Sequence, residues 1–258
     1  MNKKLNLKEP KYYNEKLQWL KLNIINPEYT TYVDKYAVRK HIEKKIGHKY
    51  LIPLIGVFDQ VSDIPWDDLP NKFVLKCTHS STTNIICSDK NLLDVESAKR
   101  KLSKWMKTNY FWYGREWPYK KVVPKIVCEA YLGDEKNVPC DYKVSCFNGK
   151  AKLIDLHQNR FTDKHSLDYY DIDWTLTDIS KKIIPNSRQS AEKPSCYDEM
   201  ISLSELLAAD FKFLRVDWYV VENKLYFGEM TIYPGAGFNG FVDERDELLL
   251  GSWIDLNP

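Results

Sequence analysis

Residues 213–237 read FLRVDWYVVENKLYFGEMTIYPGAG, and this stretch decides the fold. Apolar and polar residues alternate on both sides of a polar turn at residues 222–224, a pattern that predicts a β-hairpin. One face is predicted to cover a core and to carry Leu214, Val216, Trp218, Val220, Leu225, Phe227 and either Met230 or Ile232. The hairpin is therefore predicted to be apolar on one side only.

The opposite face of this hairpin is predicted to carry polar side chains that could form a functional site. Side chains two positions apart on a strand share a face, so Arg215 lies beside Asp217 and Glu229 lies beside Thr231. Carboxylates held close together repel unless a cation sits between them, and hard oxygen ligands suit Mg²⁺, which usually also binds substrate phosphates. Glycines in the following turn, at residues 234–237, let a backbone approach a ligand closely. The alternative interpretation is a solvated outer face of a surface hairpin.

Composition limits the class of protein. The chain has 258 residues, 43% of them hydrophobic, so it can bury a full core, and its formal charge of +2 implies no polyanion such as nucleic acid as a partner. Its six cysteines form no CxxC pair, which favours reduced structural thiols. The first 16 residues lack an apolar signal-peptide core, and the apolar run at residues 50–58 is too short to span a membrane. We expect a cytoplasmic protein, and its location in the cytoplasm could be at the inner face of the membrane.

The order of elements predicts a helical first part, a mixed middle and a sheet-rich end. Helices are predicted at residues 11–25, 34–46, 94–108 and 203–209, and strands at residues 51–57, 73–75, 84–87, 126–131, 142–147 and 152–157. The helix at 94–108 carries many lysines, which either attract an anionic surface or form an ordinary solvated face.

A second candidate site is the segment NKFVLKCTHSSTTNIICS at residues 71–88. A strand that ends near Lys76, a loop of small hydroxyl residues and a second strand predict a hairpin whose tip can fold over phosphates. Backbone N–H groups and hydroxyls donate to phosphate oxygens, and the lysine adds a point charge. These loop residues are also ordinary turn formers.

A third candidate is PKIVCEAYL at residues 124–132. A buried strand that runs into an acidic residue and a short apolar linker is typical of a hinge that contacts adenine. The alternative is the end of an amphipathic strand.

Taken in order, these segments resemble the ATP-grasp superfamily, and most closely its TupA-like branch, named for teichuronopeptide biosynthesis and often found with surface-polysaccharide genes. The resemblance runs through DKYAVRKHI, FVLKCTHSS, KIVCEAYLGD, CDYKVSCFNGK and DWYVVENKLYFGEMTIYPGAG. It implies an α+β fold whose two lobes hold a nucleotide between antiparallel sheets. The implied parts are a helical lead at residues 1–33, in place of the family's usual Rossmann-like domain, a small lobe at 34–128 and a large lobe at 129–258.

The resemblance also assigns roles to residues. Arg215 matches a transition-state arginine, and Lys143 and Arg160 are expected to face the same cleft toward phosphate or acceptor. Asp217, Glu229 and Thr231 match the metal ligands, although Thr231 stands where many of these ligases have asparagine. The residues implied to bind ATP are Lys35, Lys76, His79, Ser80, Ser81, Glu129, Ala130, Tyr131, Leu132 and Asp141.

The implied activity is that of a carboxylate–amine ligase that uses ATP and Mg²⁺, with two ions expected. Its substrates would be a uronic acid or other carboxylated unit of a surface glycan and an amino acid or amine, and a lipid-linked glycan would bring the protein to the membrane surface. Three alternatives stay open. These are a sugar kinase of the same fold, a nucleotide-binding pseudoenzyme, and a glycosyltransferase that uses the DxD at residues 171–173 to hold Mn²⁺ and a nucleotide sugar.

Overall fold

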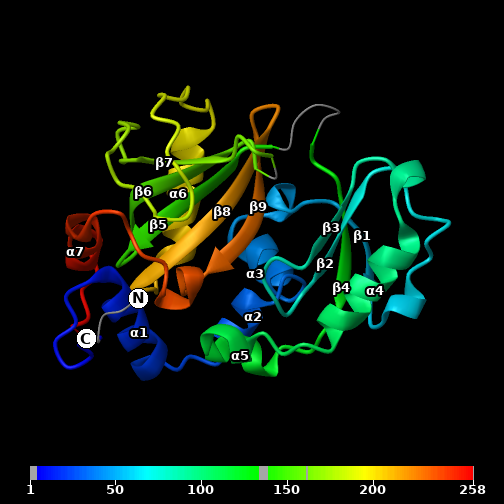
Figure 1. Ribbon diagram of the computed structural model, residues 1–258, viewed down its shortest axis with the longest axis horizontal. Helices are drawn as coiled ribbons and strands as arrows, with labels where there is room; N and C mark the ends of the chain where they lie inside the picture. Colours follow the sequence, from blue (N-terminus) through cyan, green and yellow to red (C-terminus); the bar gives the residue numbers. More distant parts are fainter. Residues whose placement is uncertain (1–4, 134–138, 161, 258) are drawn as a thin grey trace. The chain divides into compact units, whose positions relative to one another are not determined.

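A computed structural model describes residues 5–133, 139–160 and 162–257 of the chain (Figure 1). The chain divides into two compact units, residues 26–137 and residues 1–25 together with 138–258. The N-terminal helix thus groups with the C-terminal unit instead of forming a separate lead. The expected lobe boundary after residue 128 falls inside a strand, Ile126–Ala130.

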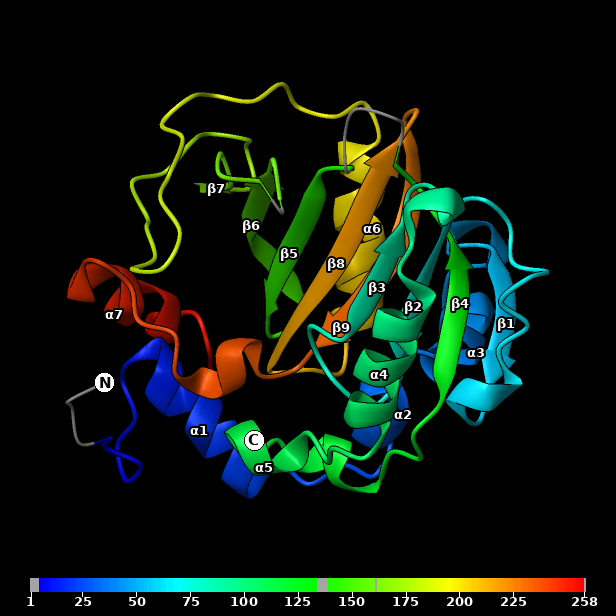
Figure 2. The same cartoon turned by 45° about the vertical axis from the view of Figure 1, so that its right-hand side comes forward.

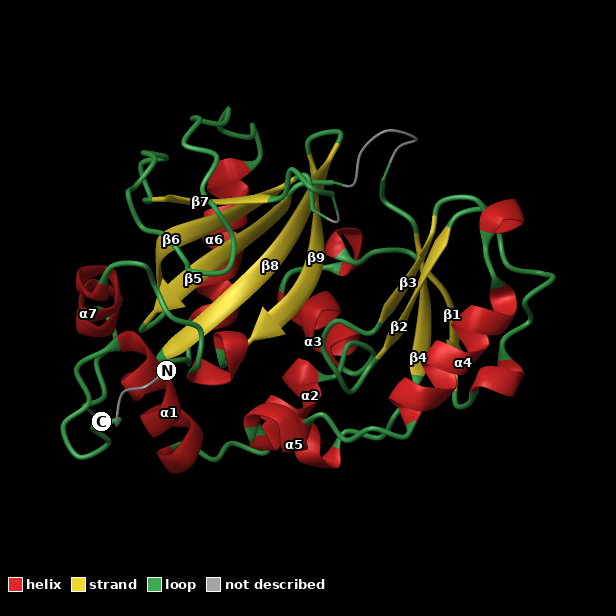
Figure 3. Ribbon diagram, viewed as in Figure 1, coloured by secondary structure: helices red, strands yellow, loops and turns green. Residues whose placement is uncertain are grey.

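The C-terminal unit is built on a five-stranded antiparallel sheet (Figure 3). Its strands are β5 (Asp141–Phe147), β6 (Lys150–Gln158), β7 (Ser166–Tyr170), β8 (Phe213–Val221) and β9 (Lys224–Thr231), in the order β7-β6-β5-β8-β9. The predicted hairpin is confirmed as β8 and β9. Its two-residue turn has positive φ at Glu222 (50°) and Asn223 (60°), the backbone that a tight hairpin requires. All the predicted core positions are buried except Val220, which is partly exposed.

A β-bulge explains how β9 serves two purposes. Asp217 pairs with Glu229, whereas its neighbour Trp218 pairs with Phe227, so Gly228 is the extra residue. Without the bulge, strict alternation would place Glu229 on the core face with Phe227. A Cβ atom at Gly228 would lie 3.0 Å from the carbonyl oxygen of Asp217, so the bulge is closely fitted to glycine. The bulge therefore turns Glu229 to the polar face while Phe227 stays in the core.

Helices cover the core face and one end of this unit. Helix α6 (Tyr197–Ala208) packs against β5, β6 and β8. Helix α1 (Tyr13–Asn23) contacts α7 (Glu244–Ser252) and the short helix η5 (Pro234–Gly237). Gln18 Nε2 and Lys21 Nζ both donate to the carbonyl oxygen of Ala236, each at 2.8 Å. The glycine-rich turn at residues 234–237, which the sequence suggested could lie close to a ligand, is thus bound by side chains of α1.

The unit of residues 26–137 contains a second antiparallel sheet in the order β1-β4-β2-β3. Its strands are β1 (Leu54–Phe58), β2 (Phe73–Cys77), β3 (Asn84–Cys87) and β4 (Ile126–Ala130). Its helices are α2 (Tyr29–Val33), α3 (Val38–Lys45), α4 (Val95–Met106) and α5 (Phe111–Gly114), with short 3₁₀ turns η1 (His48–Tyr50), η2 (Val61–Asp63), η3 (Lys90–Leu92) and η4 (Trp117–Lys121).

The core of this unit lies between its sheet and α4 (Figure 2). The side chain of Asp94 caps α4 by accepting from the backbone N–H of Ser97 at 2.8 Å. Ala98 and Leu102 then meet Phe73 and Leu75 in one buried cluster. Because alternate residues of a strand face opposite ways, Lys76 lies on the face of β2 that α4 does not cover.

The predicted elements are confirmed with small shifts at their ends. The helix predicted at 34–46 is α3 and begins at Val38, and the helix predicted at 203–209 is α6 and is longer than expected. The sequence did not indicate α2, α5, α7 or β7. Within the described residues, no helix combines the length and apolar character needed to cross a bilayer.

One buried hydrogen bond ties α6 to the sheet and can be tested. The indole Nε1 of Trp218, which is fully buried, donates to Ser204 Oγ at 2.8 Å. Ser204→Ala leaves this N–H unpaired and should lower the free energy of unfolding by about 1–3 kcal/mol. Urea denaturation measures the loss. Ser202→Ala, on the exposed side of the same helix, should change stability little. An equal effect of both substitutions would contradict the assignment.

Candidate functional site

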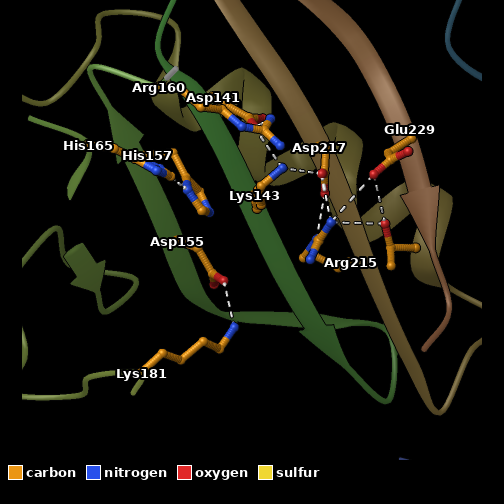
Figure 4. Close-up of polar contacts among 11 residues, drawn as sticks. Asp141, Lys143, Asp155, His157, Arg160, His165, Lys181, Arg215, Asp217 and Glu229 are labelled. Carbon is orange, nitrogen blue, oxygen red and sulfur yellow. Dashed lines mark hydrogen bonds and ion pairs between the residues drawn. The ribbon is translucent and has the colours of Figure 1, made fainter. Parts of the chain in front are cut away.

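A row of charged side chains crosses the polar face of the five-stranded sheet (Figure 4). Strand register places Lys143 of β5 opposite Asp155 of β6 on one side and opposite Asp217 of β8 on the other. Asp217 in turn lies opposite Glu229 of β9. Directly opposite residues on one sheet face are close enough to interact, so the register itself builds the site.

Arg215 is the centre of the hairpin's polar face. Its Nε donates to Asp217 Oδ1 at 2.7 Å, and its Nη2 donates to Asp217 Oδ2 at 2.8 Å and to Thr231 Oγ1 at 3.0 Å. The same Nη2 lies 3.6 Å from Glu229 Oε1. Burial alone would lower the pKa of Arg215, but Asp217 and Glu229 outweigh it and raise that pKa. The four residues that the sequence placed on one face form one contact network.

Lys143 connects this network to a second carboxylate. Its Nζ donates to Asp217 and lies 2.7 Å from Asp141 Oδ2, which also accepts from Arg160 Nη1 at 2.6 Å. Burial lowers the pKa of Lys143, but the charges of Asp141 and Asp217 reverse the effect and raise it. Asp141, expected to meet a ribose, thus holds two cations in the structure.

The oxygens that converge on Arg215 are of the kind that Mg²⁺ prefers. Asp217 and Glu229 supply carboxylates and Thr231 supplies a hydroxyl. Within the described residues, no group of three or more His, Cys, Asp or Glu side chains is arranged to hold a metal ion. A cation bound by this set would therefore complete its shell with water or phosphate oxygens, as Mg²⁺ commonly does.

The structure adds a buried pair that the sequence reasoning missed. Asp155 is 4% exposed, and within the described residues its Oδ1 has no hydrogen-bond partner. Lys181 Nζ lies 3.8 Å from Asp155 Oδ2 and 5.5 Å from the centre of the Tyr169 ring. Burial raises the pKa of Asp155 and lowers that of Lys181. The sequence does not indicate this pair, because Lys181 comes from a loop with no motif.

Two histidines lie at the other end of the row. His157 Nδ1 is 3.0 Å from His165 Nε2, a hydrogen bond in which one ring donates and the other accepts. Burial first, and then the cations Lys143 and Arg160, lower the pKa of His157 to about 2. His157 is therefore neutral at any physiological pH. Neither histidine belongs to a motif that the sequence marks as functional.

The unit of residues 26–137 carries its own charge cluster. Glu129 Oε2 accepts from Lys76 Nζ at 2.8 Å, and Oε1 accepts from Arg39 Nη1 at 2.9 Å. Arg39 also donates to the carbonyl oxygen of Ile52 at 2.8 Å. The side chain of Glu129, expected in an adenine hinge, thus joins the predicted phosphate lysine to a cation of α3. The expected hinge residues Ala130, Tyr131 and Leu132 follow it and are partly exposed.

The loop between β2 and β3 is held by its own side chains. Lys35 Nζ donates to the carbonyl oxygen of Ser80 at 2.7 Å, and Ser80 Oγ bonds to Thr83 Oγ1 at 2.5 Å. His79 Nε2 lies 3.1 Å from the carbonyl oxygen of Trp105, and burial lowers the pKa of this histidine. His79 and Ser80 are therefore buried inside the loop, whereas Ser81 is partly exposed. Lys35 and this loop, which the resemblance assigned separately to phosphate, are in contact in the structure.

Known structures identify the fold. D-alanyl-alanine synthetase A from Vibrio cholerae O1 biovar eltor matches with a TM-score of 0.52 and 11% identity, over 92% of this chain and 67% of that chain. An L-amino acid ligase from Bacillus licheniformis matches with a TM-score of 0.51 and 14% identity, over 87% of this chain and 49% of that chain. A D-alanine–D-alanine ligase from Bacillus anthracis, solved with ATP, has a TM-score of 0.46 and 16% identity, over 78% and 54% of the two chains. The first two matches support the α+β ATP-grasp fold of this chain. The chain spans about half to two thirds of the length of the three ligases.

The sequence identifies the family within that fold. A family model described as TupA-like ATPgrasp matches residues 15–255. The protein belongs to the TupA-like ATP-grasp family, as the motifs indicated. A comparison with curated proteins gives no match.

The DxD at residues 171–173 has a structural role. Asp171 Oδ1 accepts from the backbone N–H of Asp173 at 3.0 Å and of Thr175 at 2.8 Å. These bonds form a local turn after β7, which is what an Asp at this position often does. In the structure this carboxylate is therefore occupied by the backbone of its own turn.

The depressed pKa of His157 gives a pH-dependent stability that can be tested. Below pH 6.5 the unfolded chain protonates this histidine and the folded chain does not, so stability falls as pH falls toward 2. When the pH is lowered from 7 to 5, the free energy of unfolding should fall by about 2 kcal/mol less for His157→Gln than for the wild type. Denaturant titrations of both proteins at both pH values measure this difference. The contributions of other titrating groups cancel when the variant is compared with the wild type. His48→Gln, at a side chain 77% exposed, should behave like the wild type, and equal pH dependence of all three proteins would contradict a neutral His157.

Proposed function

We propose that this protein is an ATP- and Mg²⁺-dependent carboxylate–amine ligase. The observation that carries the proposal is the network around Arg215, in which a partly buried guanidinium, two carboxylates and a hydroxyl converge on one sheet face. The family and the fold support an ATP-dependent reaction. The family name favours a carboxylated unit of a surface glycan, such as a uronic acid, as one substrate and an amino acid or amine as the other.

The reaction has two steps. An oxygen of the substrate carboxylate attacks the γ-phosphorus of ATP, and ADP leaves with the electrons of the broken bond. The amine nitrogen then attacks the acyl carbon, inorganic phosphate leaves, and the nitrogen loses a proton to give an amide. Positioning and charge stabilisation carry such phosphoryl transfers, so the site needs cations and metal ligands and no side-chain nucleophile.

We assign the residues of the sheet face as follows. Asp217, Glu229 and Thr231 fit Mg²⁺, which would screen the phosphate charges when bound. Arg215 stabilises the charge that develops on the transferred phosphoryl group, because a guanidinium stays charged at every relevant pH. Lys143 holds Asp217 in place, and Arg160, whose side chain is 34% exposed, is available to an anionic substrate.

In residues 26–137 we assign phosphate binding to Lys35 and Lys76. Lys76 extends from β2 on the face opposite α4, and its contact with Glu129 fixes its position. Lys35 is fixed by its bond to the β2–β3 loop. A preordered cation loses little side-chain entropy when it meets a phosphate.

The metal assignment predicts the effect of one conservative substitution. Glu229→Gln, at a side chain 33% exposed, should leave the fold intact and lower ATP turnover by about 100-fold or more, because it removes a charged ligand from the reacting phosphate. ADP release measures the rate, and a Mg²⁺ titration should show a weakened requirement. Glu222→Gln, in the exposed turn of the same hairpin, is the matched control. Wild-type turnover of Glu229→Gln would remove the metal site from the proposal.

The phosphate assignment predicts a change in binding. Lys76→Met should weaken ATP binding by about 10- to 100-fold, the range expected for loss of one charge-assisted hydrogen bond. Isothermal titration with ATP and Mg²⁺ measures the affinity, and Lys104→Met, at an exposed position of α4, should bind like the wild type. Equal affinities of the two variants would contradict the assignment.

A product screen decides the function itself. The protein is incubated with ATP, Mg²⁺, uronic-acid-bearing glycans and a panel of amino acids and amines, and products are weighed by mass spectrometry. A ligase gives a coupled product lighter than the sum of its substrates by one water. A product that gains a phosphate instead would identify the sugar kinase alternative. ATP binding without any turnover would identify the pseudoenzyme.

A further inference from the structure

Large aromatic side chains are exposed at α5 of the unit 26–137, a short helix labelled in Figure 3. Trp112 is 61% exposed and Tyr113 is 74% exposed, although both side chains are large enough to contribute strongly to a core. Val123, just beyond η4, is 68% exposed. Single exposed apolar residues are ordinary, but adjacent exposed aromatic residues mark a surface that binds something.

Basic side chains surround these rings. The guanidinium of Arg115 lies 4.6 Å from the ring centre of Trp112 and 5.5 Å from that of Phe111. Lys120 Nζ lies 5.2 Å from the Phe111 ring. We call Tyr110, Phe111, Trp112, Tyr113, Arg115 and Lys120 the aromatic–basic patch.

The backbone at Arg115 holds the patch together. Arg115 ends α5 in the left-handed conformation, with φ of 55°, which is unusual outside glycine. Its N–H donates to the carbonyl oxygen of Phe111 at 2.8 Å. A non-glycine residue held in this region often has a functional reason, and here the conformation goes with a guanidinium close to two aromatic rings.

Positive charge predominates in the sequence around the patch. Residues 101–123 contain one acid, Glu116, and that side chain is buried. The same residues contain exposed cations at Lys101, Lys104, Lys107, Arg115, Lys120 and Lys121. The segment that carries the patch, residues 109–123, has exposed cations at Arg115, Lys120 and Lys121 and no exposed acid, so it complements a negatively charged partner, although the chain as a whole has a charge of only +2.

We propose that the aromatic–basic patch binds the surface of an anionic phospholipid bilayer. Trp and Tyr rings settle at the head-group level, where one end is apolar and the other is wet, and Lys and Arg are drawn to anionic head groups. A bilayer contacts both the aromatic and the basic side chains of the patch and also buries Val123. An acidic polymer would use the cations and leave the apolar side chains in water. Binding is reversible, because the segment is short and carries no long apolar helix.

Vesicle co-sedimentation of the full chain tests the proposal. The protein should sediment with vesicles of phosphatidylglycerol and phosphatidylcholine, much less with phosphatidylcholine alone, and less as salt rises. The double variant Trp112→Ala/Tyr113→Ala should weaken partition by at least about tenfold. Arg115→Ala/Lys120→Ala should also weaken it by about tenfold or more, since each cation near such a surface strengthens partition by about fivefold.

Two controls separate the patch from general charge and hydrophobicity. Lys40→Ala/Lys44→Ala removes the same charge from α3, and Leu92→Ala removes a side chain that is 84% exposed. Both should partition like the wild type. The proposal is overturned if the wild type ignores anionic vesicles, if the patch variants bind as well as the controls, or if the protein binds a soluble polyuronate through the same cations and not the vesicles. All these side chains are exposed, so circular dichroism should show every variant folded.

Discussion

The ion pairs of Lys143 are the constraint on which the candidate site depends. Three carboxylates, Asp141, Asp155 and Asp217, are each at most 4% exposed and lie on neighbouring strands of one sheet. Buried charges are tolerated only when they are paired, and removing one member of such a set leaves an uncompensated charge. Lys143, from the central strand, lies opposite two of them and contacts the third. The register of β5 with β6 and β8 therefore has to be kept for the charges to balance, and it is also what aligns the site.

Ion pairs between different elements also order the second sheet, where the shared partner is a carboxylate instead of a cation. Glu129 of β4 holds Lys76 of β2 and Arg39 of α3, so one carboxylate fixes two cations from different elements. In both sheets a charge that can bind an anion is positioned by a carboxylate across the strands. Each unit thus orders its own cations through contacts within itself, before any contribution from a ligand.

The sequence predicted what local patterns can determine. Alternation and a two-residue turn define the β8–β9 hairpin. Arg215 and Asp217 share a face because they lie two positions apart on one strand, and Glu229 and Thr231 share a face for the same reason. The sequence could not reveal the Gly228 bulge as a structural device, although the bulge is why the alternation changes phase in β9. The role of Glu129 was beyond reach as well, because its partners lie 53 and 90 residues away. Lys181 shows the same limit, since a loop outside any pattern brings it to Asp155.

The charge balance of the sheet face bears on how a nucleotide would bind there. Arg215, Lys143 and Arg160 contribute three positive charges, and Asp141, Asp217 and Glu229 contribute three negative ones, so these groups sum to zero. Under the proposed function, phosphates that arrived alone would add several negative charges to a neutral and largely buried network, at a high electrostatic cost. Phosphates that arrive with a divalent cation add far less net charge, and that cation can take oxygens of Glu229 and Thr231 as ligands. The balance of the network is therefore a physical reason for nucleotide and metal to enter together under the proposed function, and it explains why a site proposed to bind an anion has both acids and bases.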